Sequence, residues 1–163
     1  MLHAGLSKNK IVRADVEDLE QTLIGWTLRV QGKGRTVNDE QVPSDKLAVA
    51  PTQHYLDARS DAGSTDPLFI SHGRRSFGQR LNTRSVRSRI NGYLKEAGIK
   101  RPGVTPHSLT HTAALLWLND GMPLEQVKER MRHGMLDTTM IYYKKQGLLK
   151  RDPETGDDVN VEH

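Results

Sequence analysis

The chain contains no cysteine, few aromatic residues and no long apolar run. Among its 163 residues, Phe, Trp and Tyr together make up 5%. The absence of cysteine excludes a disulfide scaffold, a thiol nucleophile and any metal site with a cysteine ligand. No segment approaches the roughly 20 apolar residues that span a bilayer, and the start MLHAGLSKNK lacks the apolar region of a secretory signal. We therefore expect a cytoplasmic protein that does not contact a membrane.

The net charge of +4 conceals two regions of opposite sign. Residues 151–163 carry a net charge of −4 and predict an acidic, disordered tail, whereas residues 1–150 carry +8 and form the one expected domain. Residues 71–104 hold nine Lys or Arg side chains and one acid, Glu96. Such a stretch suggests nucleic-acid binding, because phosphate neutralisation releases counterions, but on charge alone a solvated cationic surface explains it equally well. The side chains that we expect to bind DNA are Arg74, Arg75, Arg84, Arg87 and Arg89.

The apolar pattern predicts an α+β fold that is mainly helical, with a small antiparallel sheet near the N-terminus. Alternation over Trp26–Gln31, a turn at Gly32–Gly34 and a return at Gln41–Pro43 are typical of a hairpin. Helices are expected over about 45–59, from Thr83 to before Gly98, from Thr105 to Asn119, from Pro123 to about Met131, and around Met140–Tyr143. Because nearly all strands precede residue 44, α+β is favoured over alternating α/β.

Apolar side chains at helical spacing also predict which faces are buried. For the helix from Thr83, the expected buried residues are Val86, Ile90, Tyr93, Leu94 and Ala97. For the helix from Thr105, they are Leu109, Ala113, Leu116 and Trp117. These faces define where each helix should pack.

His107 and His111 are four residues apart on one expected helix, so they project from the same face. With His133 they supply three nitrogen ligands, which leaves a metal-dependent hydrolase as an alternative. The pattern His-Glu-x-x-His is absent, because residues 108–110 are Ser, Leu and Thr.

The order of motifs resembles that of the tyrosine recombinases, the phage integrase family. The runs T-P-H-S-L-T-H-T at 105–112, R-H-G at 132–134 and D-T-T-M-I-Y at 137–142 are similar to the family's Thr-Pro-His-x-Leu-Arg-His-Thr, Leu-Gly-His and Thr-rich turn before a tyrosine. Gly32-Lys33-Gly34 with Val42-Pro43 resembles the family's strand–Gly-Lys-Gly–strand hairpin, and Gly5-Leu6 resembles the start of its first arginine motif. The resemblance covers roughly residues 3–145.

This resemblance implies a catalytic domain that cleaves and rejoins double-stranded DNA through a 3′-phosphotyrosine intermediate. It implies no metal or other cofactor, assembly with other protomers on DNA, and a bacterial, phage or mobile-element context. The family's roles fall on Tyr142 as nucleophile rather than Tyr143, His107 as general acid–base, His133 as a ligand of the scissile phosphate, and Lys33 as the donor of a proton to the leaving 5′-oxygen. His111 matches a structural position rather than a catalytic one.

Two departures from the family pattern bear on activity. Ser7 and Thr110 stand where the family has its two arginines, which clamp the phosphate oxygens and stabilise the transition state. We therefore expect impaired cleavage, and a catalytically inactive duplex-DNA-binding module is the alternative. Lys8 and Lys10 are cations close to the first vacant position. The chain also begins near the first arginine motif, without the family's leading DNA-clamping domain, so we expect an N-terminally truncated catalytic domain.

Overall fold

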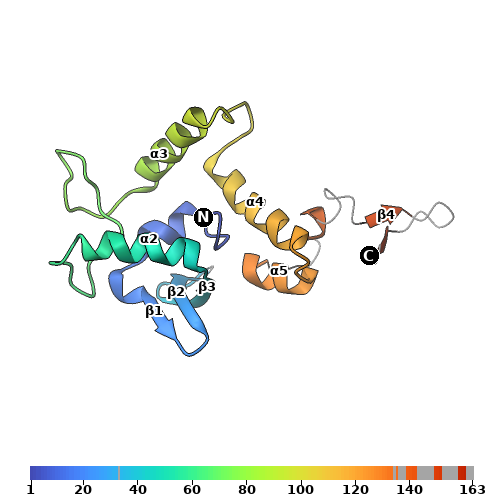
Figure 1. The fold of residues 1–163 in the computed structure, drawn as a ribbon, viewed down its shortest axis with the longest axis horizontal. Helices are drawn as coiled ribbons and strands as arrows, with labels where there is room; N and C mark the ends of the chain where they lie inside the picture. The colour runs from blue at the N-terminus through green and yellow to red at the C-terminus, as the bar shows by residue number, and fades with distance from the viewer. Residues whose placement is uncertain (33, 134, 136–138, 143–148, 152–157, 161–163) are drawn as a thin grey trace. The chain divides into compact units, whose positions relative to one another are not determined.

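The computed structural model describes residues 1–32, 34–133, 135, 139–142, 149–151 and 158–160. The chain divides into two units, residues 1–110 and 111–163, and each is described by itself (Figure 1). The elements are, in order, α1 (Lys8–Arg13), the 3-10 helix η1 (Val16–Asp18), β1 (Leu19–Thr22), β2 (Gly25–Gln31), β3 (Asn38–Ser44), α2 (Lys46–Asp57), α3 (Thr83–Glu96), α4 (Pro106–Asn119), α5 (Leu124–Met131), β4 (Leu149–Arg151) and β5 (Asp158–Asn160).

The first unit contains an antiparallel sheet of strand order β1-β2-β3. In the central strand, Leu28 lies opposite Leu19 of β1 and Val42 of β3. Because side chains alternate along a strand, Leu28 and Val30 share the face that is buried. The pairing shifts between Val30 and Gln31, just before the turn that leads to β3. The predicted hairpin is thus confirmed, and β1 is a third strand that the sequence did not predict.

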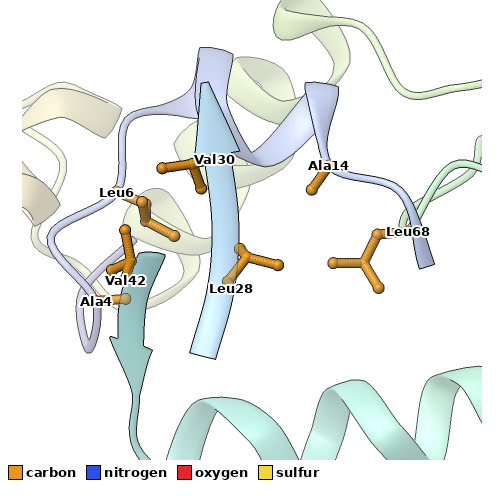
Figure 2. Close-up of a cluster of buried hydrophobic side chains, with 7 residues drawn as sticks. All are labelled: Ala4, Leu6, Ala14, Leu28, Val30, Val42 and Leu68. Atoms are coloured by element: carbon orange, nitrogen blue, oxygen red, sulfur yellow. The ribbon is translucent and has the colours of Figure 1, made fainter. Parts of the chain in front are cut away.

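Small and branched apolar side chains form the core of this unit. Figure 2 shows side chains from β2, β3 and the segments around α1 that point toward one another. The cluster consists of Ala4, Leu6, Ala14, Leu28, Val30, Val42 and Leu68. Ile11, Leu19, Leu56 and Phe69 pack against it, so α1, α2 and the sheet share one core. Full burial of a Leu or Val side chain contributes about 1.5–3 kcal/mol, which makes this cluster the main stabilising feature of the first unit.

The segment between α2 and α3 has little regular structure and is held by side-chain hydrogen bonds. Arg59 Nη1 donates to the carbonyl oxygens of Pro67 and Leu68, each at 3.0 Å. Arg80 Nη1 donates at 3.2 Å to the carbonyl oxygens of Val12 and Ala14 after α1. Arg80 also forms an ion pair with Asp15. Arg80 therefore has a structural role, although it belongs to the basic stretch.

The helix α3 confirms the predicted element but corrects its buried face. Asn82 caps it, because its side chain accepts a hydrogen bond of 2.8 Å from the Ser85 amide. Val86 and Leu94 are buried, whereas Tyr93 is 63% exposed and Ala97 is also exposed. Leu94 lies only about 1.5 Å further along the helix than Tyr93 but about 100° around it, so the difference is one of direction: the buried face turns toward Leu94 and away from Tyr93.

The second unit has its own small core. It consists of Ala114 and Leu118 from α4, Val127 and Met131 from α5, and Tyr142 from the helical residues 139–142. Leu116 was expected on the buried face of α4 but is 45% exposed. It lies about 200° around the helix from both Ala114 and Leu118, which together form the buried edge.

The end of the chain contains the pair β4 and β5, which are antiparallel with Lys150 opposite Val159. The remaining residues of the segment 151–163 lie outside the described residues, so the disordered tail stays a prediction. None of the helices in the described part of the chain has the length and apolarity that crossing a bilayer requires.

Candidate active site

The first unit contains an open pocket of about 340 Å³. Residues at the starts of α1 and α4 and one residue of α3 line it. The start of α1 contributes Ser7, Lys8 and Asn9, α3 contributes Arg87, and the start of α4 contributes Thr105, Pro106 and His107, with Met1 completing the lining. Residues that are up to a hundred positions apart in sequence thus line one pocket. One of them is His107, the predicted acid–base residue.

Local hydrogen bonds at the start of α4 determine the position of His107. The Thr105 amide donates to Ser108 Oγ at 3.1 Å, and the Ser108 amide donates to the Thr105 carbonyl oxygen at 2.9 Å. Pro106 is the first helical residue, where its missing N–H costs nothing. These features start the helix sharply and leave His107 exposed in its first turn. The predicted helix start is confirmed.

The two positions where the family has arginines meet beside this pocket. Thr110 is 5% exposed, and its hydroxyl donates a hydrogen bond of 3.2 Å to the carbonyl oxygen of Leu6, the residue before Ser7. The Thr110 side chain therefore binds the backbone and is not part of the pocket lining. Ser7 does line the pocket, and its side chain makes no capping bond to α1.

The two nearby lysines have different environments. Lys10 Nζ forms an ion pair of 3.1 Å with Glu40, and both side chains are mostly buried. Lys8 lines the pocket instead. Only Lys8 of this pair is placed to contact an anion there.

In the second unit, Tyr142 lies between two histidines. Its hydroxyl is hydrogen-bonded to Nδ1 of His111, and its ring is stacked on that of His133, with centroids 6.1 Å apart and an interplanar angle of 9°. His133 Nδ1 is itself hydrogen-bonded to Thr139 Oγ1 at 2.9 Å. The structure thus brings together His133 and Tyr142, both predicted from the sequence. It adds His111, whose contact with the tyrosine no sequence signal indicated.

Burial changes the acidity of this cluster. Tyr142 is 5% exposed, and its loss of hydration raises the pKa of the phenol above its usual value of 10. Burial also lowers the pKa of His133, and the charge of Arg132 lowers it further. At neutral pH the tyrosine is therefore protonated and His133 is uncharged. Attack by Tyr142 then needs a group that removes its proton.

The five arginines predicted to bind DNA are all exposed. Arg84, Arg87 and Arg89 lie on α3, and Arg74 and Arg75 lie in the loop before it. None of the five forms a hydrogen bond or ion pair with another residue of the described ranges, in contrast to Arg80. Their charges are available to a partner, and contact with DNA remains a prediction.

Lys33 and Tyr143 lie outside the described residues, so their predicted roles are not addressed by the structure. His107 belongs to the first unit, and His133 and Tyr142 to the second. Within the part of the chain that is described, no group of three His, Asp or Glu side chains is placed to hold a metal ion. The hydrolase alternative gains no support from these residues.

Known proteins match most of the chain. The family model described as the phage integrase family matches residues 1–147. The tyrosine recombinase XerC of Pelobacter propionicus is 35% identical over 140 residues, which are 85% of this chain and 43% of that protein. XerC of Chlamydia pneumoniae is 31% identical over 151 residues, 91% of this chain and 46% of that protein. The chain thus spans less than half the length of these relatives.

Solved structures share the fold. The XerA recombinase superposes with a TM-score of 0.71 at 25% identity, over 89% of this chain and 53% of that one. The XerH recombinase in a post-cleavage complex with its difH substrate gives a TM-score of 0.72 at 22% identity, over 90% and 41% of the two chains. The matched residues 1–147 include both the pocket around His107 and the cluster around Tyr142. With this span and this identity to the XerC proteins, the chain belongs to the phage integrase family of tyrosine recombinases.

Proposed function

We propose that this chain is the DNA-cleaving and DNA-rejoining portion of a site-specific recombinase, with Tyr142 as its nucleophile. The observation that carries the proposal is the contact of the Tyr142 hydroxyl with His111 under the stacked ring of His133. A buried tyrosine with an imidazole nitrogen at its hydroxyl has a partner for the proton that it must lose. A buried phenol needs a hydrogen-bond partner in any case, and an imidazole nitrogen is a partner that can also take up its proton.

The proposed reaction exchanges one phosphodiester for another. The phenol oxygen of Tyr142 bonds to a backbone phosphorus, and the bond from that phosphorus to the 5′-oxygen breaks. His111 accepts the phenol proton, Lys33 donates a proton to the leaving 5′-oxygen, and His107 and His133 bind or protonate phosphate oxygens. Attack of a 5′-hydroxyl on the phosphotyrosine reverses these steps and rejoins the strand, so no external energy source is required.

The expected partners are double-stranded DNA and further protomers bound to it. The XerH structure has the same fold with its difH substrate bound, and five exposed arginines on α3 and the preceding loop of this chain are available for phosphates. Cleavage by this chain should nevertheless be slow. One positioned donor at the reacting phosphate typically contributes about 10²–10³ in rate, and neither Ser7 nor Thr110 carries a guanidinium.

A second function, duplex-DNA binding without cleavage, is favoured by one observation. The Thr110 hydroxyl is committed to the Leu6 carbonyl oxygen, so this position offers nothing to a phosphate. A DNA-binding module would keep the exposed arginines and would not need the Tyr142 hydroxyl as a nucleophile.

The experiment that separates the two functions is capture of a covalent adduct. Nicked duplexes with a randomised sequence around the nick trap the phosphotyrosine, because the short strand released after cleavage diffuses away. Denaturing gels and sequencing of protein-bound DNA then detect the adduct and its site. We expect slow adduct formation by the unmodified chain, none by Tyr142→Phe, and retained formation by the control Tyr143→Phe.

Two results would contradict the enzymatic proposal. An adduct that persists in Tyr142→Phe would assign the nucleophile to another residue. Firm duplex binding with no adduct from any sequence in the pool would establish the binding module instead.

A further inference from the structure

We propose that Lys8 and Arg87 form a phosphate-binding site in the pocket of the first unit and replace the charge of the two family arginines. The expected ligand is a backbone phosphate of DNA. That the phosphate belongs to DNA rests on the proposed function, whereas the ability of the pocket to bind an anion does not.

The charge of the pocket is the first argument. Its lining contains two permanent cations, Lys8 and Arg87, and no carboxylate. Neither cation forms a hydrogen bond or ion pair with any other residue that the structure describes. Two uncompensated positive charges in one concave site repel each other, and a bound phosphate relieves that repulsion while it gains charge-assisted hydrogen bonds.

The position of Arg87 on α3 is the second argument. At about 100° per residue, Arg84 lies about 60° and Arg89 about 160° around the helix from Arg87, yet of these three arginines Arg87 alone lines the pocket, together with the start of α1. The packing of α1 against α3 brings the face of Arg87 to the start of α1, where Lys8 lies. Arg87 is thus the arginine of α3 that lines the pocket together with Lys8.

The neutral groups of the pocket suit the same ligand. Ser7 lines it with a hydroxyl that makes no capping bond, and His107 lines it with an imidazole. Its volume of about 340 Å³ lies within the range of about 300–1,000 Å³ that is usual for small-ligand pockets. A guanidinium fork, an ammonium, a hydroxyl and an imidazole are together a donor set for a tetrahedral oxyanion.

Other nearby side chains do not fit this role. Lys10 is held by Glu40, and Thr110 is buried against Leu6. The site therefore has the charge of the family's two arginines but not their positions. The proposed site thus predicts phosphate binding together with slow cleavage.

Titration of the whole chain with inorganic phosphate at constant ionic strength tests the site, with amide chemical shifts as the readout. We expect the largest shifts at Ser7, Lys8 and His107. Loss of a charge-assisted hydrogen bond typically changes affinity about tenfold, so Arg87→Gln and Lys8→Gln should each weaken phosphate binding by about that factor. The matched control is Lys95→Gln, an exposed cation in the last turn of the same helix, which should change the affinity less than twofold.

The comparison with the control decides the proposal. Equal weakening by Lys95→Gln and Arg87→Gln, or shifts that concentrate away from the pocket, would overturn it, because either result indicates general electrostatic attraction. Amide spectra of each variant without phosphate verify that it is folded. Adduct formation is a separate measurement: phosphate binding at Lys8 and Arg87 without an adduct would refute cleavage and leave this site standing.

Discussion

At position 110, a buried threonine takes the place of a family arginine and forms a contact of its own. Its hydroxyl satisfies the Leu6 carbonyl oxygen, which lies one residue before the other substituted position, Ser7. The bond joins α4 to the segment before α1, which are separated by about a hundred residues. Thr110 thus stabilises the wall of the pocket instead of contacting a ligand.

This role predicts the effect of removing the hydroxyl. Thr110→Val keeps the size and branching of the side chain but leaves the Leu6 carbonyl oxygen without its donor. A buried unsatisfied group costs about 1–3 kcal/mol, so the free energy of unfolding in urea should fall by that amount. Thr65→Val, in an exposed loop, is the control and should change it by less than about 0.5 kcal/mol. Equal effects of the two substitutions would show that the Leu6 bond contributes nothing.

Residue types and spacing predicted part of the candidate site. His107, His133 and Tyr142 were predicted through the resemblance to the family, whereas the start of α4 at Pro106 follows from Thr105-Pro106 alone. The partners of Arg80, Lys10 and His111 do not, because each lies 30 or more residues away and depends on packing. For the same reason, the sequence did not show that Arg80 differs from the other cations of residues 71–104, or that Lys8 differs from Lys10.

At the scale of the element, α3 has buried apolar residues and exposed arginines. Val86 and Leu94 are buried, whereas Arg84, Arg87 and Arg89 are exposed, and Arg87 also lines the pocket. Its start at Thr83 and its end before Gly98, where φ is +69°, were predicted from the sequence. The exposure of Tyr93 was not predicted, since an apolar stripe shows which residues are suited to burial and not which of them the neighbouring elements cover. The strand β1 was missed because four residues show too little alternation.

The exposed arginines Arg84 and Arg89 of α3 predict how DNA affinity depends on salt. Each phosphate contact adds about 0.9 to the slope of log affinity against log salt concentration. The double variant Arg84→Gln with Arg89→Gln should therefore lower the slope for a short duplex by about 1.8, measured by fluorescence anisotropy between 50 and 200 mM salt. Lys46→Gln, an exposed cation at the start of α2, is the control and should leave the slope unchanged. An unchanged slope in the double variant would locate the DNA surface on other elements.

At the scale of the whole molecule, buried apolar side chains among the described residues form two clusters, one in each unit. One contains Leu68 and the sheet, and the other contains Met131 and Tyr142. No residue belongs to both clusters. Proteins open locally in cooperative units, and each core is expected to define one such unit. The environment of the proposed nucleophile then depends on the stability of residues 111–142 more than on that of the sheet.

Hydrogen exchange of the whole chain tests this expectation. Leu68→Ala and Met131→Ala each remove a buried side chain, which typically costs about 2–5 kcal/mol. Leu68→Ala should accelerate amide exchange mainly in β1–β3 and α2, and Met131→Ala mainly in α5 and the C-terminal half of α4, by a factor of about 30 or more where exchange requires unfolding of that unit. The controls Leu47→Ala and Met135→Ala remove side chains that are each 71% exposed and should change exchange little. Equal acceleration in both units by either core variant would contradict the expectation, because it would mean that the two cores unfold together.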